Sequence, residues 1–195
     1  VVGGGPAGLA AALAAADEGA RATLIDDQAS LGGHLRFDSG NHSALPGLAD
    51  GPGADLAIRL VTEAQGSPNI EILSGATVLA HYQDNLLTIL HGNELVKLRA
   101  KRVVLATGSY EVPIQFQNND LPGIMLATAA QRLIHLYGIK PGNTAVVVTD
   151  NDQGYQAALD MMNAGVHVAA VVDSRPGNID GLEAAASVIA RGVQI

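Results

Sequence analysis

The strongest constraint on this chain is a run of glycines near its start, between a short apolar strand and a long alanine-rich stretch. Residues 3–8 read GGGPAG and fit the pattern G-x-G-x-x-G. Pro6 stands where a helix tolerates proline in its first turn, and Gly19 stands where that helix would stop. Residues 22–25 form a second apolar run that leads into acidic residues. This order predicts the strand, helix and second strand of a parallel α/β sheet.

Each position of the glycine run has its own chemical reason in a dinucleotide site. Gly3 permits the tight turn, Gly5 lets backbone amides approach a pyrophosphate, and Gly8 lets the helix lie close to the strand. Pro6 and Ala7 fall in the first helical turn, where the positive end of the helix dipole faces the phosphates. We therefore expect these five residues to bind the ADP part of a dinucleotide.

Two acidic residues follow the second strand, close to the spacing of roughly 20 residues at which such sites place a ribose-binding acid. A carboxylate there accepts hydrogen bonds from the ribose hydroxyls. Strand length favours Asp26, with Asp27 as the alternative. Because a carboxylate repels a 2′-phosphate, NADP is disfavoured at this site.

The composition supports an α/β fold. The chain has 195 residues, 48% of them hydrophobic but only 3% aromatic, so Ala, Val, Leu and Ile must fill the core, as in parallel sheets covered on both faces. The net charge of −8 disfavours nucleic acid and anionic membrane surfaces as partners. The absence of cysteine excludes disulfides and thiol nucleophiles.

The sequence shows no targeting or membrane-spanning signal. No apolar run approaches the roughly 20 residues of a membrane span, and no signal peptide is visible, so we expect a cytoplasmic protein without a membrane partner. The first strand holds only Val1 and Val2, shorter than the usual length of about 5 residues. We therefore expect the chain to be a fragment of a longer protein.

The pattern of apolar runs predicts two α/β domains. We expect a dinucleotide-binding domain at 1–111, a linker at 112–126 and a second, incomplete Rossmann-like domain at 127–195. In the first domain, a loop over 29–53 is followed by a helix and then by short β-rich runs between residues 70 and 106. The fold class is α/β, with two Rossmann-like three-layer domains, the first carrying a small antiparallel β-meander insertion.

The spacing of these runs sets the elements that we expect. The β-rich runs, IEIL among them, form the meander, and a buried strand over 103–106 returns to the main sheet. The remaining elements are helices near 55–64, 127–136, 155–163 and 182–190, strands over 145–149 and 167–172, and a strand opening at residue 193.

The second α/β half departs from the dinucleotide pattern. After the strand over 145–149, residues 150–155 read DNDQGY, with one glycine and two carboxylates. These carboxylates would repel a pyrophosphate. We expect a degenerate copy without a working nucleotide site, kept for structure or for contact with other subunits.

Two further signals lie near the predicted site. Gly32 and Gly33 follow the second strand, and the run over 103–108 ends in Ala106, Thr107 and Gly108. This doublet and the strand ending in ATG resemble the two-dinucleotide-binding-domain flavoprotein superfamily, which includes the pyridine nucleotide-disulfide oxidoreductases of the thioredoxin reductase and glutathione reductase types. The resemblance implies that the ATG segment lies near the cofactor, at the edge of the first domain.

A longer segment carries a narrower resemblance. Residues 106–142, with the phrase NNDLPGIMLA, resemble the α subunit of heterotetrameric sarcosine oxidase. Related amine dehydrogenases and cyanide-forming glycine oxidases share parts of this segment. The family's α subunit is much longer than this chain, with sequence before the first strand and a folate-binding, aminomethyltransferase-like region after the second α/β domain.

The resemblance also implies cofactors and partners. In that family FAD and the amine-oxidising site belong to the β subunit, FMN lies between α and β, and NAD occupies the dinucleotide site of α. It implies a cofactor role for these residues of the chain: Gly3, Gly5, Gly8, Asp26, Asp27, Gly33, Thr107 and Gly108. We expect NAD in the first domain, with FAD as the alternative because both present the same ADP moiety. No catalytic residue carries over, and the isolated fragment is not expected to be active alone.

Two other functions compete with this hypothesis. A self-contained FAD-dependent NAD(P)H reductase would need a working second site, and a pure scaffold would leave the acid at Asp26 without a purpose. The six histidines lack metal-binding spacing, so no metal is expected. His34, beside the glycine doublet, is either a cofactor neighbour or an exposed loop residue.

Overall fold

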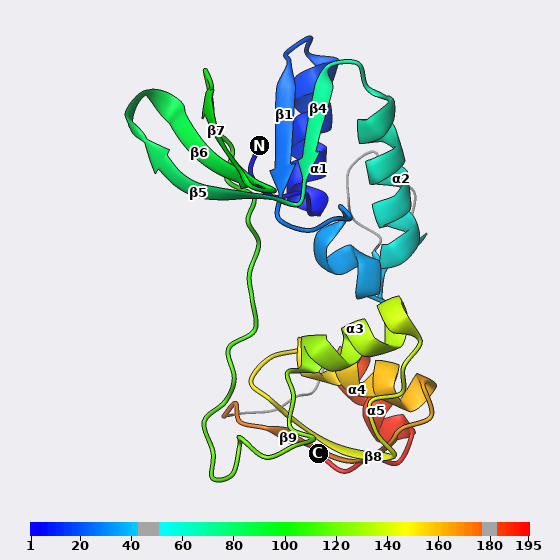
Figure 1. The fold of residues 1–195 in the computed structure, drawn as a ribbon. Helices are drawn as coiled ribbons and strands as arrows, with labels where there is room; N and C mark the ends of the chain where they lie inside the picture. Colours follow the sequence, from blue (N-terminus) through cyan, green and yellow to red (C-terminus); the bar gives the residue numbers. More distant parts are fainter. Residues whose placement is uncertain (43–50, 177–182) are drawn as a thin grey trace. The chain divides into compact units, whose positions relative to one another are not determined.

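The computed structural model describes residues 1–42, 51–176 and 183–195, which form two compact units, Val1–Ser109 and Tyr110–Ile195 (Figure 1). Each unit has its own sheet, helices and hydrophobic core. The α/β class expected from the sequence is confirmed. The functional boundaries at 1–111, 112–126 and 127–195 stay a prediction.

The first unit is built on a small parallel sheet. Strand β1 (Ala22–Asp26) pairs in parallel with β4 (Ile70–Ser74), and Val2 bridges to Ile25 of β1 and to Leu105. The expectation that the IEIL run belongs to the meander is wrong, because this run is β4. Ile72 packs on the helix side of the sheet and Leu73 on the opposite side, so apolar groups contact β4 on both faces, as a strand of a covered parallel sheet requires.

Two helices cover one face of this sheet. They are α1 (Pro6–Asp17) and α2 (Gly53–Gly66). Leu9 of α1 and Leu56 of α2 are buried together with Leu24 of β1. Between β1 and α2, in the expected loop, lie a short 3₁₀ helix, η1 (Gly33–Phe37), and an antiparallel pair of two-residue strands, β2 (Asn41–His42) and β3 (Gly51–Pro52). Residues 43–50 of the expected loop lie outside the described residues.

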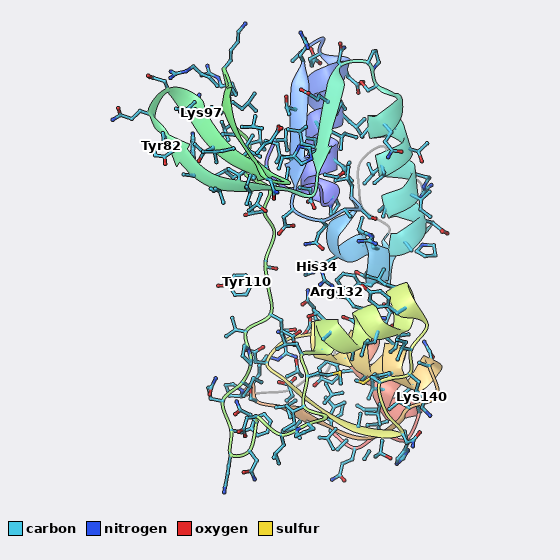
Figure 2. The ribbon with its side chains drawn as sticks, in the orientation of Figure 1. His34, Tyr82, Lys97, Tyr110, Arg132 and Lys140 are labelled. Atoms are coloured by element: carbon cyan, nitrogen blue, oxygen red, sulfur yellow. The ribbon has the colours of Figure 1, made fainter. Side chains whose placement is uncertain are left out.

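The predicted meander covers the other face. Its strands are β5 (Ala76–Tyr82), β6 (Leu86–His91) and β7 (Glu94–Arg99), which pair antiparallel in that order, with the short 3₁₀ turn η2 (Gln83–Asn85) between β5 and β6. Leu87 and Ile89 pack against Ile25, while Tyr82 and Lys97 project into solvent (Figure 2). The first unit therefore has three layers: helices, parallel sheet and meander (Figure 1).

The segment over 103–106 differs from its expectation. In place of a buried strand it forms a single bridge, between Leu105 and Val2, and Leu105 is 63% exposed. The backbone still runs beside Val2, because the Val2 N–H donates to the Val104 carbonyl and the Ala106 N–H donates to the Val2 carbonyl. The segment therefore pairs with the sheet through Val2.

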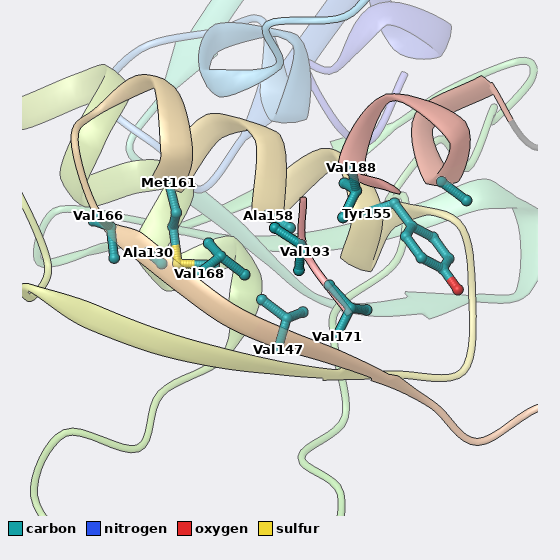
Figure 3. Close-up of a cluster of buried hydrophobic side chains, with 11 residues drawn as sticks. Ala130, Val147, Tyr155, Ala158, Met161, Val166, Val168, Val171, Val188 and Val193 are labelled. Atoms are coloured by element: carbon teal, nitrogen blue, oxygen red, sulfur yellow. The ribbon is translucent and has the colours of Figure 1, made fainter. Parts of the chain in front are cut away.

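The second unit places helices over a parallel pair of strands, β8 (Thr144–Thr149) and β9 (His167–Asp173). The helices are α3 (Ala127–Tyr137), α4 (Gln153–Asn163) and α5 (Glu183–Ala190), close to the expected bounds. Their core contains Val147, Tyr155 and Val188 (Figure 3), whereas Val146 and Val148 on the opposite face of β8 are exposed. The strand expected at residue 193 is present as one bridge, between Gln194 and Ala170.

The segment between the main elements of the two units, residues 110–126, contains no helix or strand. It is nevertheless attached to the second unit. The Glu111 carboxylate accepts hydrogen bonds from the Ala127 N–H, at 3.0 Å, and the Thr128 N–H, at 2.9 Å. Glu111 therefore caps the start of α3 with a negative charge, where the helix dipole favours one.

Candidate dinucleotide site

Two glycines of the motif are required by the packing of the backbone itself. Gly3 has a φ of 104°, and a side chain there would overlap the carbonyl group of Ala106. A side chain at Gly8 would overlap the carbonyl oxygen of Gly3, because α1 crosses the glycine loop at this point. These two positions are therefore glycine for the fold alone.

Gly5 is different. Its φ of −75° suits any residue, and the nearest atom to a Cβ placed on it would be the Cα of Gly33, at an ordinary contact distance of 3.9 Å. The fold leaves room for a side chain at this position. The absence of one keeps the backbone open to a molecule that lies against the loop.

The start of α1 beside Gly5 can bind an anion. Gly5 is the N-cap of α1, and no side chain of the described residues caps this helix. Pro6 has no N–H, and within the described residues the N–H groups of Ala7 and Gly8 have no hydrogen-bond partner. Unpaired N–H groups together with the positive end of the helix dipole form a binding position for a phosphate.

The two candidate acids occupy different positions. Asp26 is the last residue of β1, and its carboxylate accepts hydrogen bonds from the Gly4 N–H and, at 2.8 Å, from the Gln28 N–H. A carboxylate has about four acceptor positions, so Asp26 can also accept bonds from ribose hydroxyls. Asp27 is exposed and bonds the side-chain amide of Gln28 at 2.9 Å. The geometry therefore favours Asp26, whose contact with a ribose stays a prediction.

The glycine doublet joins the same site. The Gly32 N–H donates to the Gly4 carbonyl at 2.8 Å, and Gly33 lies opposite Gly5. Sequence reasoning did not include Gly4, although it connects the loop to both the doublet and Asp26. A side chain at Gly4 would overlap Leu31 and come within 3.0 Å of the Asp26 carboxylate. The signal was the run of three consecutive glycines, of which Gly4 is the second.

The structure brings Ala106 to the loop but leaves its two successors in solvent. The Ala106 carbonyl lies against Gly3, and its side chain faces Gly8. Thr107 and Gly108 are exposed. His34, at the start of η1, is also exposed and lies beside Phe37 with their ring centroids 5.1 Å apart (Figure 2).

Two other kinds of feature are absent from the described parts of the chain. No group of three or more His, Asp or Glu side chains there is placed to hold a metal ion. No helix there has both the length and the apolar character needed to cross a membrane.

A glycine loop between a parallel strand and a helix, with an acid at the end of the next strand, defines a dinucleotide-binding α/β protein. The comparison with protein families agrees, since the model for "Pyridine nucleotide-disulphide oxidoreductase" matches residues 1–192. The chain belongs to this family of oxidoreductases.

The similar proteins are much longer than this chain. It is 37% identical over 190 residues to the sarcosine oxidase subunit alpha of Rhizobium meliloti (strain 1021), covering 90% of the chain and 19% of that protein. It is also 37% identical over 211 residues to the subunit of the same name from Corynebacterium sp. (strain P-1), covering 100% of the chain and 21% of that protein. The resemblance to the sarcosine oxidase α subunit is confirmed, and the chain spans about a fifth of the length of these relatives.

A solved structure agrees in fold. The L-proline dehydrogenase from P. horikoshii is 25% identical, with a TM-score of 0.76, over 91% of this chain and 36% of that one. The Rossmann-like fold class is thereby confirmed.

Proposed function

We propose that this chain is the dinucleotide-binding part of a subunit of a multi-subunit, amine-oxidising oxidoreductase similar to the sarcosine oxidase α subunit. Its first unit binds the ADP part of NAD. The observation that carries the proposal is Gly5, because the fold leaves space for a side chain there and the absence of one keeps the backbone of the loop open to a ligand.

The residues around Gly5 divide the recognition of the dinucleotide between them. The N–H groups of Ala7 and Gly8 at the start of α1 donate to the pyrophosphate, and Gly33 keeps the opposite side of the loop free of a side chain. Asp26 accepts the ribose hydroxyls and repels a 2′-phosphate. When bound, NAD supplies two-electron hydride chemistry.

The choice of NAD over FAD rests on the resemblance to the α subunit, since both cofactors present the same ADP moiety to Gly5 and Asp26. FAD remains the alternative, and with it the function of a self-contained NAD(P)H reductase. The wider site of this proposal includes the glycine doublet and Ala106, Thr107 and Gly108.

Amine oxidation is assigned to a partner subunit. The relatives of this chain are named as subunits of an oxidase, which supports a hetero-oligomer. The chain contributes a dinucleotide site to the assembly. A cytoplasmic location is part of the same proposal.

Equilibrium dialysis of the purified chain against NAD, NADP and FAD, each alone, tests the identity of the ligand. We expect NAD to bind and NADP to bind at least about tenfold more weakly, a difference of about 1.4 kcal/mol, because of the charge of Asp26. Binding of FAD without binding of NAD would instead support the reductase. Equal affinity for NAD and NADP would remove Asp26 from the ribose site.

A further inference from the structure

The second unit retains the framework of the glycine loop. A side chain at Gly154 would overlap the side chain of Thr149, five residues earlier, as a side chain at Gly8 would overlap Gly3. Residues 149–154 therefore occupy the positions of residues 3–8, and Asp173 ends β9 as Asp26 ends β1. This correspondence permits a comparison of the two loops, position by position.

Two backbone donors of the second loop are already in use. The Asn151 N–H, at the position of Gly5, donates to the Thr149 hydroxyl oxygen at 3.1 Å. The Gln153 N–H, at the position of Ala7, donates to the side-chain oxygen of Asn151 at 3.0 Å. The N–H that remains unpaired at Ala7 of α1 thus has a partner within the loop at the equivalent residue of α4, Gln153.

The acid of the second unit is also fully paired. Asp173 accepts one hydrogen bond from the Arg175 N–H at 3.0 Å, others from the Arg175 guanidinium at 2.8–3.2 Å, and one from the Tyr155 hydroxyl at 2.7 Å. Its side chain is only 6% exposed. These bonds occupy about all four acceptor positions of a carboxylate, whereas Asp26 has two described donors.

The loop has a second carboxylate at the start of α4, the position where a pyrophosphate would lie. Asp152 is the N-cap of α4 and accepts a hydrogen bond from the Arg175 guanidinium at 2.7 Å. Arg175 therefore joins the start of α4 to the end of β9 through Asp152 and Asp173. A dinucleotide would have to break both ion pairs and place its phosphates beside Asp152, so these residues do not fit the nucleotide that the family name implies for a second site.

We propose that the second unit is a closed copy of the dinucleotide site, in which Arg175, Asp152 and Asp173 take the place of a bound nucleotide. It binds neither NAD(H) nor NADP(H). Hydride from a pyridine nucleotide cannot enter through this unit, so the chain binds a single dinucleotide, in the first unit.

Amide NMR spectra of the ¹⁵N-labelled full chain, titrated with NADH and with NADPH to millimolar concentration, test this proposal. The amides of Asn151, Gln153 and Ser174 report on the second unit, and those of Gly4 and Gly32 report on the first. We expect no saturable shifts in the first set that arise from nucleotide bound to the second unit, whatever the second set does. If the first unit fails to bind nucleotide, that failure is seen at Gly4 and Gly32, not at the residues that test this proposal.

A variant distinguishes direct binding from an effect transmitted from the first unit. In Gly5→Val the first site is blocked, so shifts at Asn151 or Gln153 that disappear in this variant would originate in the first unit and agree with the proposal. Shifts that persist in Gly5→Val and are lost on Asp173→Ala would overturn it, because they would show a nucleotide at the end of β9.

Discussion

At the scale of single residues, one motif contains glycines with different roles. Gly3 and Gly8 are glycine because neighbouring carbonyl groups leave no space for a Cβ, whereas the space beside Gly5 is open. The sequence pattern alone treats the three alike. The structure distinguishes Gly3 and Gly8, which the fold requires to be glycine, from Gly5, which we assign to ligand binding.

Alanine at Gly3 and alanine at Gly5 should therefore differ in their effect on the stability of the fold. Gly3→Ala should lower the free energy of unfolding by at least about 2 kcal/mol, because a φ of 104° strains an L residue and the Cβ meets Ala106. Gly5→Ala should change it by less than about 0.5 kcal/mol. Urea unfolding followed by circular dichroism measures both, and equal losses of stability would contradict the assignment of Gly5 to the ligand.

At the scale of elements, the sequence predicted most helices and strands because their apolar spacing is local information. Helices α3 and α4 and strands β8 and β9 lie within two residues of their expected bounds. The IEIL run was misplaced, since its composition does not reveal whether it pairs with β1 or with its sequence neighbours. The segment over 103–106 is not the buried strand that its apolar sequence predicts, because burial depends on pairing across the sheet and the described residues pair it with Val2 alone.

The sequence also predicts part of the candidate site, but not all of it. The glycine loop, Asp26 and the doublet converge as expected, because the carboxyl ends of adjacent parallel strands lie at one edge of a sheet. The role of Gly4 could not be predicted, since it depends on hydrogen bonds to Asp26 and Gly32 across the loop. The pairing of Asp152 with Arg175 was equally hidden, because the two residues are distant in sequence.

The ion pairs that join α4 to β9 predict a pH dependence. Hydrogen bonds from Arg175, and then from Tyr155, hold the pKa of the Asp173 carboxyl well below its ordinary value. Its contribution to stability is therefore complete above the unfolded-state pKa of about 3.9 and is lost as pH falls below that value toward the folded-state pKa. The second unit should lose stability in acid for this reason.

Arg175→Met tests this prediction. Between about pH 4 and pH 2 the free energy of unfolding of the wild-type chain should fall more steeply than that of the variant, in which Asp173 has lost its main hydrogen-bond donor. Urea unfolding at a series of pH values measures the two slopes, with the exposed Arg99→Met as a control that keeps the wild-type slope. Parallel slopes for Arg175→Met and the wild type would show that Asp173 is not held ionised by Arg175.

At the scale of the whole molecule, the chain combines two related α/β units that have diverged at the same loop. The first keeps unpaired N–H groups at the start of α1 and an acid with spare acceptor positions. The second pairs the Gln153 N–H, equivalent to that of Ala7, and the acid Asp173 within the unit. Under the proposed function, the first unit holds one dinucleotide and the oxidation of substrate takes place in other parts of the assembly.

The most direct test of this account is calorimetric titration of NAD into the wild-type chain, Gly5→Val and Gly66→Val. Gly66 is a matched control, because it lies at the end of α2 with open space around it. We predict that the wild type and Gly66→Val bind one NAD per chain and that Gly5→Val, although folded, loses binding at least about a hundredfold, or about 2.7 kcal/mol. Unchanged affinity in Gly5→Val would contradict the glycine loop as the site.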